Sequence, residues 1–258
     1  DSYVETLDMM TGVQRLRLRD GKWAQTTGAV YKMWDPQKHI VEWFPIPEDW
    51  TRIRVIDFGY NNPCTCQWWA LDPDDNMYLY RQLYRSKTLI TDMADTILAL
   101  DSGEDIEATI CDHDAMERAL LEEKGIQTLP AVKDITSGIQ EVEARLRGTS
   151  IEQVREDQVL HDVMDDTYVP PVYVPTLFVM ANSLHERDTL LEQAHLPTSF
   201  EEEIVGYVYP PASRSTGERE VPMKRHDHAM DAMRYAVKYF GWQPHDNLTP
   251  IPPQSIMP

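Results

Sequence analysis

Residues 53–59, Ile-Arg-Val-Ile-Asp-Phe-Gly, hold the pattern that decides the fold class of this chain. A short apolar run ends there at Asp57, because the Phe-Gly pair that follows is a turn signal. Residues 66–71 and 77–83 are also rich in strand-forming residues, and the turn sequence Asp-Pro-Asp-Asp-Asn at 72–76 separates them. Three strands joined by tight connections predict an antiparallel meander.

Helical and strand-like patterns alternate after the meander. The predicted strands are 107–111, 126–129, 177–180 and 204–209, and the predicted helices are 88–100, 114–124, 136–147, 183–194 and 227–240. Thr136 or Ser137 is the expected cap of the third helix, and Gly125 and Gly148 are expected to end the second and third. This order predicts an α/β fold: a mixed β-sheet, made of an antiparallel meander plus parallel strands, with helices on both faces.

The composition is that of a soluble globular protein, with 42% hydrophobic and 26% charged residues in 258. Lys and Arg number 24 against 43 Asp and Glu, a net charge of −19, which argues against holding polyanions by bulk attraction. Cys64, Cys66 and Cys111 are too few for a disulfide framework, so we expect buried thiols in a reducing compartment. No apolar run approaches the ~20 residues that cross a bilayer, so no membrane partner is expected.

The sequence divides into three parts by composition. Residues 1–50 are mixed in character and are interpreted as a connecting segment. Residues 51–243 carry the predicted strands and helices and are expected to form one domain. Residues 244–258 contain five prolines in fifteen positions and are expected to be a flexible tail.

Acidic residues stand at three places that such a sheet would bring together. Asp57 ends the first strand of the meander, and Asp112 closes the fourth predicted strand, 107–111. Asp227, His228 and Asp231 stand at the head of the last helix. Strand ends collect residues from distant parts of a chain, and carboxylates are the ligands that Mg²⁺ and Mn²⁺ prefer. The pattern therefore predicts a site for a hard divalent cation.

Each acidic group also has a simpler interpretation. Asp57 could be only a turn residue. Asp227 and Asp231 are a like-charge pair at helical spacing, and a protonated His228 could offset their repulsion without a metal. Asp114 is interpreted as a helix cap, with Glu117 as its capping-box partner.

Other chemistries fit the sequence less well. His226, His228 and Asp231 would suit Zn²⁺, but the remaining ligands of such a site are not placed near a strand end. The tripeptide Asp-Phe-Gly at 57–59 is found in protein kinases, but the glycine-rich loop and catalytic loop of a kinase are absent. The only Gly-Lys pair, at 21–22, does not belong to a Walker phosphate loop.

Four stretches, in this order, resemble one family: residues 23–35, 56–63, 111–114 and 227–235. Together they are similar to the nuclease domain of the large terminase subunit of tailed bacteriophages, over roughly residues 20–240. The last stretch, Asp-His-Ala-Met-Asp-Ala-Met-Arg-Tyr, is the most specific. The resemblance implies a ribonuclease H-like fold and a metal-dependent DNA endonuclease that cuts concatemeric viral DNA during genome packaging.

The resemblance also implies roles and partners. Asp57, Asp112 and Asp231 would be catalytic ligands of two Mg²⁺ or Mn²⁺ ions, with Asp57 as the bridge and His228 and Asp227 beside them. Such a pair of ions clamps the attacking and leaving oxygens of a phosphodiester. The implied partners are double-stranded DNA, a packaging ATPase domain in the same protein joined through residues 1–50, the small terminase subunit and the portal. The implied location is the host cell cytoplasm.

Positive residues near these motifs are candidates for contacts with DNA phosphates. They are Lys133, Arg145, Arg147, Arg214, Arg219, Lys224 and Arg225. Two rival interpretations remain. One is a junction resolvase or ribonuclease of the same fold, and the other is a noncatalytic docking module whose carboxylates only cap helices.

Overall fold

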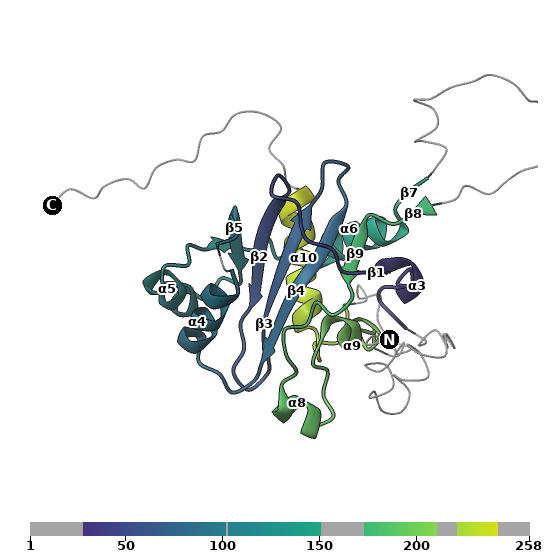
Figure 1. The fold of residues 1–258 in the computed structure, drawn as a ribbon. Helices are drawn as coiled ribbons and strands as arrows, with labels where there is room; N and C mark the ends of the chain where they lie inside the picture. The colour runs from purple at the N-terminus through teal and green to yellow at the C-terminus, as the bar shows by residue number, and fades with distance from the viewer. Residues whose placement is uncertain (1–27, 102, 151–172, 211–220, 242–258) are drawn as a thin grey trace, which may run out of the picture.

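A seven-stranded mixed sheet forms the centre of the protein in a computed structural model that describes residues 28–101, 103–150, 173–210 and 221–241 (Figure 1). Its strand order is β1-β9-β4-β3-β2-β5-β6. The antiparallel meander comprises β2 (Thr51–Asp57), β3 (Cys64–Leu71) and β4 (Met77–Arg85). Four strands pair in parallel around it: β1 (Ile40–Val41), β5 (Ala108–Cys111), β6 (Leu129–Pro130) and β9 (Leu177–Met180). The predicted mixed sheet is confirmed.

Helices cover both faces of this sheet, as predicted. One face packs against α6 (Ile135–Arg147), α9 (Phe200–Ile204) and α10 (His228–Gly241). The other packs against α4 (Ile90–Asp101) and α5 (Ala115–Glu123), seen beside β2 and β5 in Figure 1. Shorter elements are α3 (Pro36–His39), α8 (Thr189–Gln193) and the antiparallel pair β7 (Thr149–Ser150) and β8 (Tyr173–Val174).

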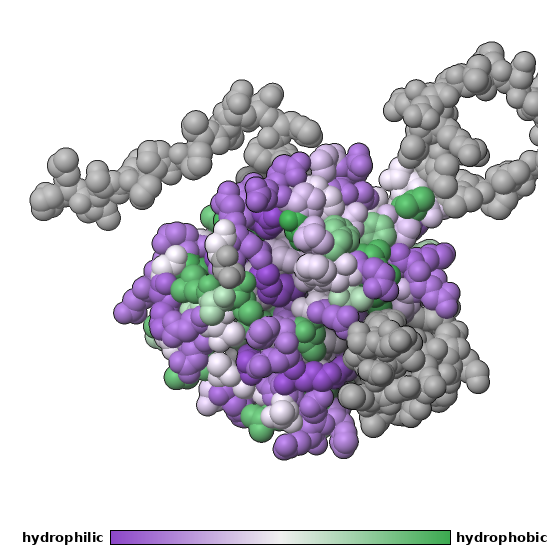
Figure 2. Space-filling model, in the orientation of Figure 1, coloured by the Kyte–Doolittle hydropathy of each residue, from purple (hydrophilic) through white to green (hydrophobic). Residues whose placement is uncertain are grey.

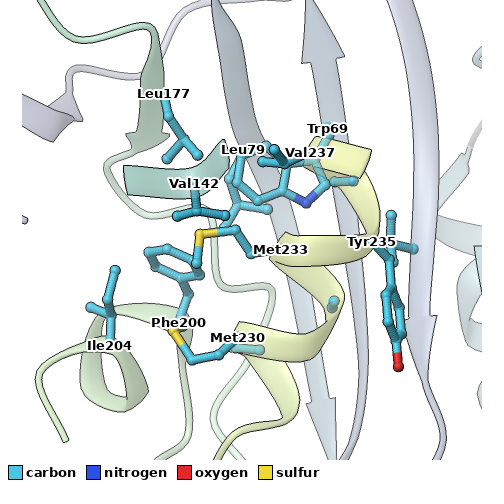
Figure 3. Close-up of a cluster of buried hydrophobic side chains, with 14 of the residues drawn as sticks. Trp69, Leu79, Val142, Leu177, Phe200, Ile204, Met230, Met233, Tyr235 and Val237 are labelled. Carbon is cyan, nitrogen blue, oxygen red and sulfur yellow. The ribbon is translucent and has the colours of Figure 1, made fainter. Parts of the chain in front are cut away.

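Two hydrophobic cores follow from strand geometry, because successive side chains of a strand point to opposite faces. Trp69 of β3 lies in the core beneath α10, and its neighbour Trp68 lies in the core beneath α4. Figure 3 shows the first core, where Phe200 from α9 lies beside Met230 and Met233 of α10. Both faces are covered, so almost every residue of β3 is buried.

Residues 183–209 differ from the sequence prediction. The helix predicted over 183–194 is only the five-residue α8, because the Asp188 side chain caps it at Leu190 and Leu191. The predicted strand 204–209 is wrong. Ser199 caps α9 instead, and the stretch that follows makes one isolated bridge, Ala29 with Val208.

Two smaller boundaries also differ. The cap of α6 is Asp134, whose side chain accepts from the Ser137 amide, and not Thr136 or Ser137. The strand predicted over 126–129 is reduced to the two residues of β6.

Several local predictions are confirmed. Asp114 caps α5 by accepting from the amides of Met116 and Glu117. Gly148 ends α6 at φ +79°, and a Cβ there would collide with the Val174 carbonyl, so only glycine fits. The three cysteines are free and buried.

The surface agrees with the polar composition. On the face shown in Figure 2 hydrophilic residues predominate, and hydrophobic ones form small separate groups. Among the described residues, every helix is too short or too polar to span a bilayer.

Candidate functional site

Strand register brings Asp57 and Asp112 to the same end of the sheet. β2 and β5 are parallel neighbours, with Ile56 paired with Cys111. The aspartate is the next residue in each case, as the last residue of β2 and the first residue after β5, and neighbouring strands lie only ~4.8 Å apart. The predicted convergence of these two acids follows directly from this pairing.

The first turn of α10 is held over the same strand ends by β3. Gln67 Nε2 donates to the Ala229 carbonyl at 3.1 Å, and Thr65 Oγ1 donates to the His228 carbonyl at 3.4 Å. His228 Nδ1 then lies 2.9 Å from Asp57 Oδ2. The motif of the last helix thus meets the end of β2.

Burial controls the charge of the Asp57–His228 pair. Asp57 is 8% exposed, and burial raises its pKa to about 6 despite the hydrogen bond from His228. Burial alone lowers the pKa of His228, but the bond to Asp57 and the nearby carboxylates outweigh burial and raise it. The pair therefore favours an imidazolium donating to a carboxylate, with Nδ1–H as the donor.

Asp112 is the more exposed acid and is paired with Lys133. The Lys133 ammonium contacts Asp112 Oδ1, and the His113 amide donates to the same oxygen. Partial burial on its own raises the pKa of Asp112, but Lys133 and the His113 amide outweigh it, so the pKa is lowered. Asp112 is consequently ionised in the folded protein.

Asp231 is paired with Arg234 one turn further along α10. Arg234 Nη2 donates to Asp231 Oδ1 at 2.5 Å, and Nη1 donates to the Tyr207 hydroxyl at 3.2 Å. Arg234 is 4% exposed and packs against Gly138 of α6, where a Cβ would approach its Cδ to 3.2 Å. Burial raises the pKa of Asp231 although Arg234 opposes the rise.

A polar cavity of about 210 Å³ opens beside these residues. Asp112, Asp227 and Asp231 line it, together with Lys133 and Tyr235. Lys224, Arg234 and Tyr207 also contribute to its wall. A larger cavity of about 690 Å³, at the far end of α6, contains none of the predicted acids. The smaller cavity is therefore the candidate site.

The predicted DNA-contacting cations do not all gather at this cavity. Lys133 and Lys224 line it, and Arg225 stands next to Lys224 with its Nε donating to His226 Nε2 at 3.1 Å. Arg145 instead binds the carbonyl and carboxylate of Asp75 at the C-terminal end of α6, where Arg147 is exposed. Arg214 and Arg219 lie outside the described residues.

Two residues that the structure places at or next to the site were assigned no role from the sequence. Glu203 of α9 is 1% exposed and accepts from the Ala229 amide at 2.6 Å, so it holds the start of α10. Burial raises its pKa to about 8. Tyr235 lines the cavity, and burial together with the carboxylates of Asp57, Asp231 and Asp112 raises its pKa. The acidic run at 201–203 is the only sequence signal for Glu203.

Glu203 makes the stability of the metal-free protein depend on pH. Its carboxyl group has an ordinary pKa of 4.5 and a folded-state pKa of about 8, so folding favours the protonated form. That stabilisation is complete below pH 4.5 and is lost as the pH rises through about 8. We expect the melting temperature to fall over this range. The free energy of unfolding should decrease by at most ~1.4 kcal/mol per pH unit from this group.

Glu203→Gln should flatten this decline, because glutamine accepts the same hydrogen bond and does not titrate. Melting curves at several pH values measure the effect, with Glu123→Gln on the exposed side of α5 as control. Parallel pH profiles for wild-type protein and Glu203→Gln would refute the assignment.

The donor chemistry fits a hard divalent cation. Asp112 and Asp231 provide carboxylates in the wall of the cavity, and Asp57 lies at the neighbouring strand end; burial raises the pKa of Asp57 and of Asp231. Within residues 28–101, 103–150, 173–210 and 221–241, no three His, Cys, Asp or Glu side chains form a preformed metal cluster. Each of the three acids instead has its own cationic partner.

Comparison with known proteins rests on structure alone. No protein family model matches the sequence, and no curated protein sequence does. The large terminase from a thermophilic bacteriophage matches with a TM-score of 0.57 and 21% identity, over 92% of this chain and 51% of that one. The P22 large terminase nuclease domain matches with a TM-score of 0.56 and 18% identity, over 84% of this chain and 95% of that one.

This chain thus spans about half the length of the thermophilic phage terminase and most of the length of the P22 domain. The chain has the ribonuclease H-like fold of large terminase nuclease domains.

Proposed function

We propose that this chain is a divalent-metal-dependent DNA endonuclease that cuts concatemeric viral DNA during genome packaging. The observation that carries the proposal is the register of β2 and β5, which sets Asp57 beside Asp112 under the first turn of α10. Asp112 and Asp231 line one polar cavity and Asp57 stands at the neighbouring strand end, which supports the proposal in a fold found in large terminase nuclease domains.

Asp57, Asp112 and Asp231 would hold the metal, with His228 and Asp227 beside them. When bound, two Mg²⁺ or Mn²⁺ ions would polarise the scissile phosphate and lower the pKa of a water that attacks it. His228 orients the Asp57 carboxylate through the bond from its Nδ1, and Arg234 fixes Asp231. Gln67 and Glu203 keep the first turn of α10 in position, so that these side chains stay aligned.

Binding of the substrate would use the cations of the cavity wall. Lys133 and Lys224 line the cavity, and Arg225 stands beside it, so they can face phosphates close to the acids. The net charge of −19 opposes a tight complex with DNA. We therefore propose that a packaging ATPase domain in the same protein provides most of the grip, with the small terminase subunit and portal as further partners in the host cell cytoplasm.

The test is conversion of supercoiled plasmid to nicked and linear forms in Mn²⁺ or Mg²⁺, with EDTA as the negative control. We expect cleavage that requires the metal and that favours duplex DNA. Branched DNA and RNA–DNA hybrids of equal length serve as competing substrates, because a resolvase or ribonuclease of this fold would prefer them. Absence of metal-dependent cutting on every substrate would leave a docking role instead.

A further inference from the structure

Three cations pair with the acids of the candidate site, and Lys133 is the most exposed of them. Its ammonium contacts Asp112 Oδ1, yet 47% of its side chain is exposed. The side chains of His228 and Arg234, which pair with the other two aspartates, are only 14% and 5% exposed. Lys133 can therefore leave its partner by rotating into solvent, whereas the other two cations are enclosed by the core.

The surroundings of Lys133 leave its ammonium free for exchange. It stands between β6 and α6, and the next carboxylate, that of Asp134, is committed to capping α6 through the Ser137 amide at 3.1 Å. Lys133 lines the same cavity as Asp231 and Lys224. A long flexible side chain with a compact charge can reach either Asp112 or a phosphate bound at that cavity.

We propose that Lys133 is an internal counter-ion that Asp112 exchanges for the divalent cation, and that the released ammonium then binds a phosphate of the DNA. This inference rests on the proposed function. The Lys133–Asp112 pair competes with the cation when DNA is absent. Once displaced, Lys133 strengthens DNA binding, so cation and DNA bind cooperatively and each raises the affinity for the other.

The exchange also explains how a chain with a large net negative charge can attract the phosphates of DNA. With Lys133 held by Asp112, the metal-free site offers phosphate little net attraction. Occupation of Asp112 by a cation frees one positive charge and adds the charge of the ion at the same place. Attraction for DNA is thereby confined to the metal-loaded site.

The first measurement is Mn²⁺ affinity without DNA, from the electron paramagnetic resonance signal of free Mn²⁺. Lys133→Met removes the competing charge and should tighten Mn²⁺ binding by roughly 1.5- to 5-fold, the range expected for one partly exposed ion pair. Lys133→Arg retains the charge and should stay near wild type. Lys124→Met removes an exposed lysine that pairs with Asp95 on the other face, and is the matched control.

The second measurement is affinity for a short DNA duplex in EDTA and in Ca²⁺, another hard cation with oxygen ligands. In EDTA, Lys133→Met should bind DNA only slightly more weakly than wild type, because the lysine is then occupied by Asp112 and the variant loses only the neutralisation of that carboxylate. In Ca²⁺ the variant should bind several-fold more weakly, and the slope of log affinity against log salt should fall by about 1.

Equal Mn²⁺ affinities for wild type and Lys133→Met would overturn this inference, and so would a loss of DNA affinity that is the same in EDTA and in Ca²⁺. Neither result affects the proposed function if wild-type protein still cuts plasmid in Mn²⁺. A wild-type protein that neither binds Mn²⁺ nor cuts DNA would overturn the proposed function and this inference with it.

Discussion

Asp57→Asn should reduce metal-dependent plasmid cleavage by at least about 10³-fold. A carboxylate that holds the catalytic cation contributes several kcal/mol to the transition state, and each 1.36 kcal/mol is about tenfold in rate. Asparagine keeps an oxygen that accepts from His228 Nδ1, so the first turn of α10 remains in place. The rate of supercoil loss in Mn²⁺, measured for both proteins at equal concentration, gives the ratio.

The stability of this variant separates catalysis from folding. Burial raises the pKa of Asp57 to about 6, so at pH 7 the folded protein carries an ionised carboxylate that burial disfavours. Removing that charge also removes the partner that keeps His228 protonated; unlike arginine, histidine can then lose its proton, so the melting temperature at pH 7 should change little. Asp95→Asn, on the exposed side of α4, should cut like wild type. Full activity in Asp57→Asn would refute the assignment of the site.

Arg234→Met is expected to have the largest effect on stability. Its loss leaves Asp231 partly buried without its cation and the Tyr207 hydroxyl without its donor. Breaking such a buried pair costs ~3–5 kcal/mol. For a domain of this size each kcal/mol lowers the melting temperature by ~2–4 °C, so we expect a fall of about 6–20 °C by calorimetry or circular dichroism.

A second variant tests the reason for that loss. When Asp231→Asn is combined with Arg234→Met, no buried charge is left unpaired, and a large part of the lost stability should return. Lys124→Ala breaks an exposed pair with Asp95. It should lower the free energy of unfolding by no more than ~1 kcal/mol, so its effect on the melting temperature should be small. If the double variant melts no higher than Arg234→Met, charge compensation is not what Arg234 contributes.

Elements with strong local signals were predictable from the sequence. The meander β2–β4 follows from apolar runs separated by turn residues, and the side chain of Asp72 accepts from the amides of Asp74 and Asn76 in one such turn. α5 and α6 follow from apolar spacing and from the glycines that end them. Each of these signals depends on residues that are close together in the sequence, so it can be recognised without the tertiary structure.

The stretch around α9 shows where local reading fails. Residues 204–209 are rich in β-branched and aromatic residues, which suits a strand, but Phe200 and Ile204, four residues apart, are both buried against α10. Their helical spacing brings them to one face, and Ser199 caps the turn. Glu203 could not be assigned a role from sequence, since its partner is the Ala229 amide of another helix.

Local chemistry was enough to specify the strands of the meander, the helix that begins at His228 and the acids at their ends, because each depends on neighbours within one or two turns. Packing alone settled which cations face Asp57 and Asp112. Asp57 meets His228 across 171 residues of chain, and Asp112 meets Lys133 from the loop before α6. Such pairs depend on strand register and on how α6 and α10 pack over the sheet, and those contacts exist only after the chain has folded.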